Sequence, residues 1–227
     1  GFVFAKANDT EDMLSKLTDD VCAVMMELVQ GEGGVMPLEK EYVQAVYAAC
    51  QKKDILFIVD EVQTGVGRTG TFYSYQQFGI QPDLVSSAKG LGGGLPIGAV
   101  LFGEKTQDTL IPGDHGSTFG GNPVVCAGAV EVLNRMDDTF LQNVTAKGRH
   151  MRKEIEKMPH VTSVAGMGMM LGIELDIDVK PVVTALMENG LLVLTAKHKM
   201  RLLPPLNIAQ TELEKGLSIL KNTLAAL

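Results

Sequence analysis

Apolar and polar positions form two kinds of pattern along the chain, which predict strands and helices. Short runs that are apolar throughout predict strands, because strands buried on both faces of a parallel sheet lack a polar side. Residues 38–53 instead have apolar positions at helical spacing and end in basic residues, which suits a helix C-terminus. The predicted strands are residues 21–29, 55–59, 82–87 and 98–102. Their alternation with helices indicates an α/β domain with a mainly parallel sheet.

The pattern changes after a long helix that opens at Asn122 and Pro123. Shorter helices and strands follow, which is typical of an α+β arrangement. We expect helices over residues 139–157 and 179–188 and from residue 210, with strands over 161–165, 169–175, 192–195 and 201–203. The sequence therefore predicts two domains, residues 1–136 and residues 137–227. A further strand is expected at the very start, from Gly1 onward.

Composition and charge exclude several classes of protein. The chain has 227 residues, of which 45% are apolar and 21% charged, so it can bury a core of its own. A net charge of −7 without any cluster of Lys or Arg argues against nucleic-acid binding. No apolar run approaches the roughly 20 residues of a membrane-spanning helix, and the start lacks a secretory signal pattern. A cytoplasmic location without membrane or nucleic-acid partners is therefore predicted.

The cysteines and histidines form no recognisable metal site in the sequence. Cys22, Cys50 and Cys126 lie far apart, and none belongs to a Cys-x-x-Cys pair. The four histidines also lack the short spacing of metal ligands on one helix. We therefore expect no metal, and three small buried thiols in a reducing compartment.

Two residues at neighbouring strand ends carry the candidate chemistry. Asp60 follows the apolar run 55–59, and Lys89 follows the strand expected over residues 82–87. Ligands of open parallel sheets bind outside the carboxyl ends of the strands. Taken alone, Asp60 suits a metal ligand, a ribose binder, a general base, a counter-ion to a heterocyclic nitrogen or a turn cap. Taken alone, Lys89 suits a structural role as well as a catalytic one.

The pair is more informative than either residue. The small residues around Lys89 leave room for a bulky group, and an amine shielded from water there can act as a nucleophile or Schiff-base partner. The glycine-rich run 90–94 does not match a phosphate loop. Enzymes that use pyridoxal 5'-phosphate (PLP) need a lysine Schiff base and a carboxylate on the pyridine nitrogen. Asp60 and Lys89 together therefore predict a PLP site.

Five separated motifs resemble those of the class III (subgroup II) aminotransferases, which depend on PLP. They are QGEGG at residues 30–34, DEVQTGVGRTG at 60–70, PDLVSSAK at 82–89, HGSTFGGNP at 115–123 and RLLPPL at 201–206. The most similar subfamily is acetylornithine aminotransferase, followed by ornithine aminotransferase. The resemblance implies fold type I of the PLP-dependent transferases. Residues 1–136 would then be the C-terminal part of the large PLP-binding domain, and residues 137–227 the small α+β domain.

The resemblance also assigns roles around the cofactor. The lysine at the position of Lys89 holds PLP as a Schiff base and moves a proton, and the aspartate at the position of Asp60 binds the pyridine nitrogen. These two are the catalytic candidates. Val62 is implied to pack on one face of the ring, and Gln63 to reach its phenolic oxygen. Thr118 is implied to bind the PLP phosphate of the neighbouring subunit in a homodimer.

The substrate-binding candidates are Arg201, Glu32 and Ser117. The resemblance implies that Arg201 binds a substrate carboxylate, for which its planar fork of donors is suited. Glu32 is expected to pair with Arg201 when no carboxylate is bound there and to release it when glutamate binds. Glu27 matches a family glutamate near the cofactor, with structural support as the alternative.

The implied reaction moves the distal amino group of N-acetylornithine, or of an ornithine-like amine, to 2-oxoglutarate in arginine biosynthesis. Ornithine, GABA and succinylornithine stay open as alternative donors. Chains of the family are longer at the N-terminus, so this chain is expected to be a C-terminal fragment that can be inactive alone. Two further alternatives are a non-catalytic fold fragment and a lyase that uses Lys89 without a cofactor.

Overall fold

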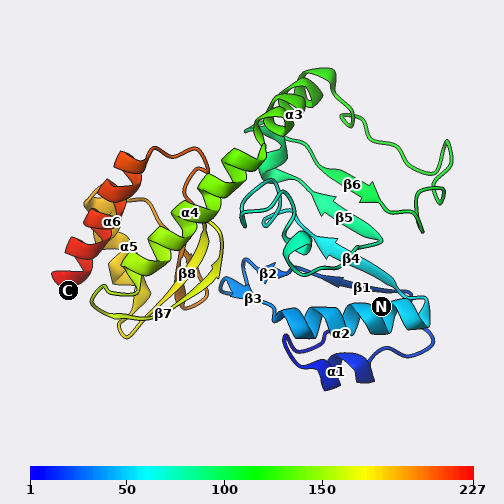
Figure 1. The fold of residues 1–227 in the computed structure, drawn as a ribbon, viewed down its shortest axis with the longest axis horizontal. Helices are drawn as coiled ribbons and strands as arrows, with labels where there is room; N and C mark the ends of the chain where they lie inside the picture. The colour runs from blue at the N-terminus through cyan, green and yellow to red at the C-terminus, as the bar shows by residue number, and fades with distance from the viewer. The chain divides into compact units, whose positions relative to one another are not determined.

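The computed structural model describes all of residues 1–227. Its chain divides into two compact units, each built from several separate segments (Figure 1). Unit 1 consists of Gly1–Leu28, Leu38–Val66 and Thr71–Asp137. Unit 2 consists of Val29–Pro37, Gly67–Gly70 and Asp138–Leu227. The chain therefore crosses between the units several times. The assignment of residues 1–136 and 137–227 to separate domains stays a prediction.

A four-stranded sheet forms the centre of unit 1. The order of its strands is β1 (Ala23–Met26), β4 (Leu56–Asp60), β5 (Leu84–Ser87) and β6 (Ala99–Phe102). β4 pairs in parallel with β1 and with β5, whereas β6 runs antiparallel to β5 (Figure 1). The connection from β5 to β6 is too short for the crossover that parallel strands need. The four predicted strands are confirmed, and the mainly parallel sheet has one antiparallel edge strand.

The helix α2 (Lys40–Lys53) leads directly into the strand that ends at Asp60. Its buried side chains recur at helical spacing and are Tyr42, Val43, Val46 and Cys50. Tyr47 adds an edge-on ring contact with Phe57 of β4, with 5.4 Å between the ring centroids. After the helix, Asp54 takes a left-handed backbone conformation with φ of 58°, which ends the helix and turns the chain into β4.

The helix α3 (Pro123–Arg135) packs against the residues that follow β5. Asn122 caps its N-terminus, because the side-chain oxygen accepts from the backbone N–H groups of Val124 and Val125 at 3.0 and 3.3 Å. Ala129 of α3 is buried together with Val66 and Leu91. Leu91 belongs to the short 3-10 helix η2 (Lys89–Gly92), so α3 supports the segment that begins with Lys89.

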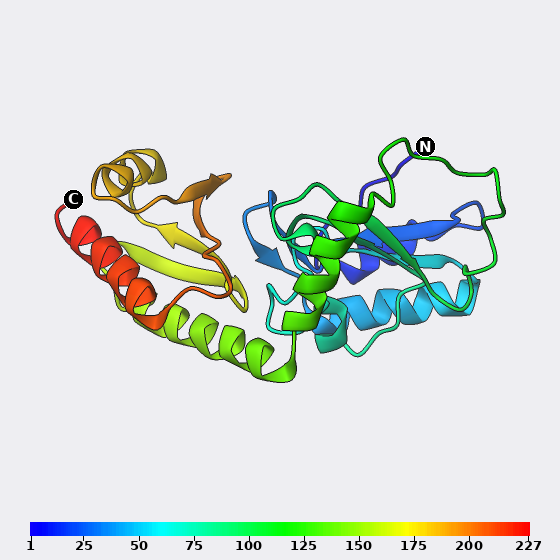
Figure 2. The same ribbon diagram turned by 90° about the horizontal axis from the view of Figure 1, so that it is seen from above.

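Unit 2 contains a second four-stranded sheet, which is antiparallel throughout. Its strand order is β7 (Val161–Met167), β8 (Met170–Leu175), β10 (Lys199–Leu202) and β9 (Leu194–Ala196). The helices are α4 (Asp138–Ile155), α5 (Val179–Glu188) and α6 (Gln210–Ala225), and α4 and α6 lie side by side (Figure 2). A separate two-stranded ribbon joins β2 (Val29–Gln30) to β3 (Met36–Pro37). The helices and strands predicted beyond residue 137 are therefore confirmed.

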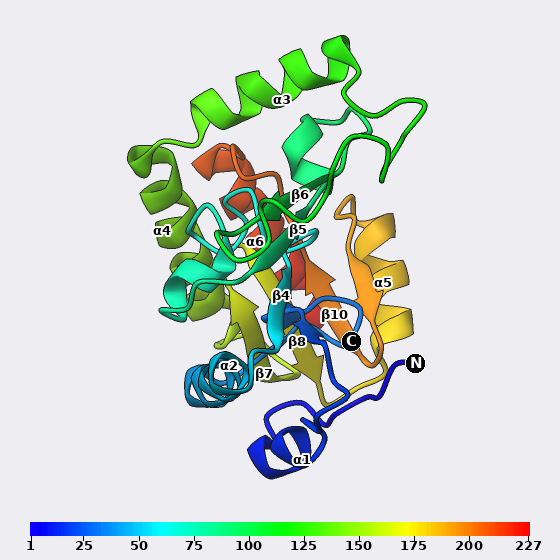
Figure 3. The same ribbon diagram turned by 90° about the vertical axis from the view of Figure 1, so that its right-hand side faces the viewer.

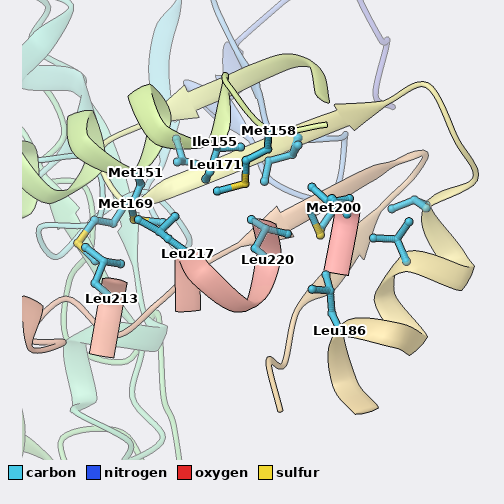
Figure 4. Close-up of a cluster of buried hydrophobic side chains, with 14 of the residues drawn as sticks. Met151, Ile155, Met158, Met169, Leu171, Leu186, Met200, Leu213, Leu217 and Leu220 are labelled. Atoms are coloured by element: carbon cyan, nitrogen blue, oxygen red, sulfur yellow. The ribbon is translucent and has the colours of Figure 1, made fainter. Parts of the chain in front are cut away.

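The core of unit 2 lies between its helices and its sheet (Figure 4). Met151 and Ile155 of α4, Leu171 of β8, and Leu217 and Leu220 of α6 belong to one buried cluster. These residues recur at the spacing of one helical face or one strand face, so the periodic pattern in the sequence is also the pattern of burial. None of the helices in the chain combines the length and apolar character needed to cross a bilayer.

Two glycines allow α4 and the segment of Arg68 to approach the turn between β7 and β8. A Cβ atom added to Gly148 of α4 would lie 2.2 Å from the carbonyl oxygen of Gly168. Gly168 itself has φ of 55°, and a Cβ atom there would lie 2.6 Å from the carbonyl oxygen of Arg68. Backbone atoms therefore leave no room for any residue larger than glycine at positions 148 and 168.

The strand predicted at the start of the chain and the burial predicted for all three cysteines are wrong. The residues from Gly1 onward form no strand because no other strand of the chain pairs with them, and Phe2 and Phe4 are exposed. The next residues form a short helix that was not predicted, α1 (Thr10–Ser15), which lies beside α2 (Figure 3). Cys22 is exposed and Cys126 is half-buried, so two of the three thiols are not buried as expected. Cys50 is buried as expected, and burial raises the pKa of its thiol to about 11.

Candidate active site

Asp60 is the last residue of β4 and is held by two hydrogen bonds. It pairs in register with Ser86 of β5, whose hydroxyl donates to Asp60 Oδ1 at 2.9 Å. The backbone N–H of Val62 donates to the same oxygen, also at 2.9 Å. The other carboxylate oxygen, Oδ2, makes no hydrogen bond within the chain. The half-buried carboxylate is therefore fixed through one oxygen and leaves the second available to a ligand.

Lys89 begins η2 directly after β5, at the same edge of the sheet as Asp60. Its φ is 46°, a left-handed conformation that is uncommon outside glycine and is found often at functional sites. The side chain is exposed, whereas the sequence predicts an amine shielded from water. The neighbours Ala88 and Gly90 leave room beside the amine but are too small to cover it. In this chain the lysine is thus presented at the strand end without being buried.

A buried carboxylate fixes the loop that carries Val62 and Gln63. Glu61 has no exposed surface, and its Oε1 accepts from the hydroxyl of Ser74 at 2.7 Å and from the backbone N–H of Tyr75 at 2.9 Å. The hydroxyl of Thr64 donates to its other oxygen. Glu61 thus connects the end of β4 to residues more than ten positions further along. Sequence reasoning missed this role, although Glu61 lies inside the motif that begins at Asp60.

Ser117 and Thr118 lie in an exposed loop between β6 and α3. Because β6 is antiparallel to β5, this loop leaves the sheet at the end opposite to Asp60 and Lys89 (Figure 1). The hydroxyl oxygen of Ser117 accepts from the backbone N–H of Gly120 at 3.0 Å, which closes a turn. No hydrogen bond within the chain joins Thr118 to Asp60. The structure therefore does not bring the loop candidates together with the strand-end candidates.

Glu32 and Arg201 form an ion pair within unit 2. Arg201 Nη1 lies 2.6 Å from Glu32 Oε1, and the two side chains are 9% and 77% exposed. Arg201 is in β10, where it pairs with Gly172 of β8. A Cβ atom at Gly172 would lie 2.7 Å from Cβ of Val35, so the loop that carries Glu32 packs closely on β8. The structure brings these two candidates together with the carboxylate on the accessible side.

A second arginine interaction in unit 2 was not predicted. Arg68 Nη1 donates to the carbonyl oxygens of Pro204 at 2.7 Å and of Met169 at 3.1 Å. Burial lowers the pKa of the Arg68 guanidinium to about 10, which reflects the cost of removing this charge from water. Pro204 follows the strand of Arg201, so Arg68 holds the segment just after the candidate substrate-binding residue. The signal available in the sequence was its place in the motif at residues 60–70.

The two adjacent strand ends carry the kinds of group that a pyridine cofactor needs, an acceptor and an amine. Asp60 offers an uncommitted carboxylate oxygen, and Lys89 offers an accessible amine from the adjacent strand end. No cluster of three or more His, Cys, Asp or Glu side chains in the chain is arranged to hold a metal ion. An α/β sheet with these two groups is characteristic of the PLP-dependent transferases.

Comparison with known proteins identifies the family. Residues 4–224 match the model of the class-III aminotransferases, so the chain belongs to this PLP-dependent family. It is 51% identical to the acetylornithine aminotransferase of Haemophilus ducreyi and 43% identical to that of Caldanaerobacter subterraneus, over 99% of the chain in each case. The alignments cover 58% and 59% of those two proteins. The chain therefore spans less than two thirds of the length of these relatives.

Solved structures of aminotransferases have a fold similar to that of this chain. The ornithine aminotransferase of Toxoplasma gondii, described with partial occupancy of PLP at its active site, superposes with a TM-score of 0.93 at 34% identity, covering 100% of this chain and 56% of that one. The N-acetylornithine aminotransferase of Stenotrophomonas maltophilia gives 0.90 at 35% identity, covering 99% of this chain and 62% of that one. The predicted family and the predicted partial fold type I architecture are confirmed.

Proposed function

We propose that the protein transfers the distal amino group of N-acetylornithine to 2-oxoglutarate, with PLP bound between Asp60 and Lys89. The observation that carries this proposal is the placement of a carboxylate and a lysine at adjacent strand ends in a chain of the class III family. N-Acetylornithine is preferred as the donor because the relatives at 51% and 43% identity are acetylornithine aminotransferases. Ornithine is the second candidate, because the solved ornithine aminotransferase of Toxoplasma gondii is also similar.

Each residue at the strand ends has a defined task in this proposal. PLP, when bound, supplies an electron sink for the bond that breaks at the amine-bearing carbon. Lys89 holds the cofactor covalently and moves a proton at that carbon. Asp60 keeps a proton on the pyridine nitrogen, since a carboxylate beside this nitrogen stabilises its charged form. Val62 packs on the ring and Gln63 bonds the phenolic oxygen, both from the loop that Glu61 fixes.

The second group of residues handles the substrates. Arg201 binds a carboxylate through its planar guanidinium. Glu32 occupies Arg201 when no carboxylate is present and swings away when glutamate or 2-oxoglutarate binds. This exchange is supported by the unequal exposure of the pair, 9% for Arg201 and 77% for Glu32, because the exposed partner is the one that can leave. Ser117 is proposed as a further substrate contact.

A homodimer completes the proposed site. Thr118 lies in an exposed loop that leaves the sheet at the end opposite to Asp60, which supports a contribution to the PLP phosphate of a second subunit. A cytoplasmic location and a place in arginine biosynthesis are part of the same proposal. Sedimentation of the purified protein at several concentrations tests the dimer, and a species that stays monomeric at every concentration argues against it.

The proposal is tested by covalent PLP binding and by amino transfer. Purified protein is incubated with PLP and reduced with borohydride, and the labelled peptide is identified by mass spectrometry. We expect the label on Lys89, and Lys89→Ala should lose both the label and all measurable transfer to 2-oxoglutarate. Lys105→Ala, which removes a lysine paired with Asp54 outside the site, is the matched control. Label spread over many lysines contradicts the proposal, and so does the absence of label when the part of the relatives that the chain does not span is also supplied.

The same assay separates the alternatives for this chain. It is run with and without the polypeptide that corresponds to the part of the relatives that the chain does not span. Labelling and turnover only in the presence of that polypeptide identify a chain that is inactive alone. A reaction that proceeds without PLP favours the lyase. Faster turnover with ornithine than with N-acetylornithine replaces the proposed donor with ornithine.

A further inference from the structure

We propose that Ser86 is a positioning residue that orients Asp60 toward the cofactor. Its hydroxyl donates to Asp60 Oδ1 at 2.9 Å, and the backbone N–H of Val62 donates to the same oxygen at 2.9 Å. Both donors therefore engage one oxygen and leave Oδ2 for the pyridine nitrogen of PLP. The inference rests on the proposed role of Asp60, and Ser86 itself touches neither cofactor nor substrate in it.

Strand pairing places Ser86 beside Asp60. The two residues are partners in the parallel register of β4 and β5, so their side chains lie on the same face of the sheet. A shift of the register by one residue would bring Ser87 opposite Asp60 and send its side chain to the other face. The contact is thus a property of how these two strands pair.

The two donors restrict the carboxylate in different ways. The Val62 N–H comes from the loop two residues after Asp60, which forms a local turn that any Asp can make with its own backbone. The terminal torsion of an Asp side chain is broad and roughly two-fold, so a single local bond leaves the carboxylate rotation loosely defined. The Ser86 hydroxyl adds a second donor from the adjacent strand, 26 positions away in the sequence. The two directions together fix the carboxylate.

The next residue provides a matched control. Ser87 is 1% exposed, lies on the opposite face of the same strand, and its hydroxyl has no hydrogen-bond partner. Ser87→Ala and Ser86→Ala therefore remove the same atom from adjacent positions of β5. Only the second change removes a bond to Asp60. Ser86→Thr keeps a hydroxyl on the correct face and serves as the conservative variant.

The first measurement is PLP affinity, followed through the visible absorbance of lysine-bound PLP during titration with PLP. Ser86→Ala should weaken binding about tenfold, which corresponds to about 1.4 kcal/mol, because a bond to a charged acceptor is lost. Ser86→Thr and Ser87→Ala should stay within about twofold of the parent. The pH at which this absorbance changes should also move in Ser86→Ala alone, since the carboxylate is no longer held beside the pyridine nitrogen.

The second measurement needs no cofactor. Hydrogen exchange of the Val62 amide, followed by NMR in the protein without PLP, reports whether Asp60 Oδ1 is held in place. We expect exchange about three- to tenfold faster in Ser86→Ala than in Ser87→Ala. Equal exchange in the two variants, or equal PLP affinity and equal pH dependence, overturns the positioning role.

Failure of the proposed function gives a different result. If neither the parent nor any variant binds PLP covalently, even with the part of the relatives that the chain does not span supplied, the function is wrong, and amide exchange alone decides whether Ser86 holds Asp60. If the parent binds PLP and Asp60→Ala weakens binding while Ser86→Ala behaves like Ser87→Ala, the function stands and the role of Ser86 is rejected.

Discussion

Arg68 offers a direct test of how far one buried guanidinium stabilises unit 2. Its Nη1 donates to the carbonyl oxygens of Pro204 at 2.7 Å and of Met169 at 3.1 Å. Hydrogen bonds that involve a charged group contribute about 1.5–3 kcal/mol each. The two bonds share one nitrogen and the second is long, so Arg68→Ala should lower the free energy of unfolding by about 2–4 kcal/mol.

The cost of burying the guanidinium, which lowers its pKa to about 10, does not cancel this loss. Alanine removes the charge but leaves the carbonyl oxygens of Met169 and Pro204 without this donor, and Met169 is fully buried. Arg68→Lys keeps the charge on a single nitrogen without the planar fork and should lose about half as much stability. Because the folded pKa is lowered, the charged form is retained at neutral pH and is lost only as the pH rises through about 10.

The assay is urea unfolding followed by circular dichroism, because the chain has no Trp to report by fluorescence. With a slope of about 1–3 kcal/mol per M of urea, the expected loss moves the midpoint by about 1 M or more. Arg135→Ala is the control, since Arg135 forms an exposed ion pair with Glu131 one helical turn away and should cost under about 1 kcal/mol. An Arg68→Ala midpoint equal to that of Arg135→Ala refutes the reasoning.

Three further predictions concern packing, pH and the substrate pair. Gly148→Ala should lower stability by about 1–3 kcal/mol in the same urea assay, because its Cβ would meet the Gly168 carbonyl oxygen at 2.2 Å; a neutral effect contradicts the close packing. Burial raises the pKa of Cys50 to about 11, so its contribution to stability is fully present below about pH 9 and is lost as the pH rises through 11. The free energy of unfolding of Cys50→Ala should depend less on pH between about 9 and 11 than that of the parent protein. An equal pH dependence in the two proteins argues against a buried thiol. Glu32→Ala should change the ratio of kcat/KM for glutamate to kcat/KM for the amine donor by about tenfold, because Arg201 loses its competing carboxylate. An unchanged ratio rejects the proposed exchange of Glu32 for a substrate carboxylate at Arg201.

The sequence predicts the location of Asp60 and Lys89 but not what holds them. Their placement follows from the apolar runs before them, because the carboxyl ends of adjacent parallel strands meet at one edge of a sheet. The bond from Ser86 to Asp60 depends on the register of two strands, which the apolar pattern does not specify to one residue. The exposure of Lys89 was also missed, since small neighbours predict space around a side chain but do not say whether anything fills it.

Contacts between segments far apart in the sequence could not be predicted from the local pattern of apolar and polar residues. Arg68 and Pro204 are 136 positions apart, and nothing in either motif indicates the other. The Glu32–Arg201 pair was predicted only because both residues match motifs of one family, and its unequal exposure required the structure. The false strand at Gly1 has a related cause, because the pattern describes a single segment whereas a strand also needs a partner.

Because the segments of the two units alternate along the chain, some contacts of unit 2 can form only late in synthesis. Glu32 leaves the ribosome 169 positions before Arg201, and Arg68 emerges 136 positions before Pro204. The early segments of unit 2 therefore lack these partners while most of unit 1 is synthesised. Contacts between residues so far apart in the sequence slow folding. Cutting the gene after residue 137 would leave unit 1 whole but would separate Val29–Pro37 and Gly67–Gly70 from the rest of unit 2.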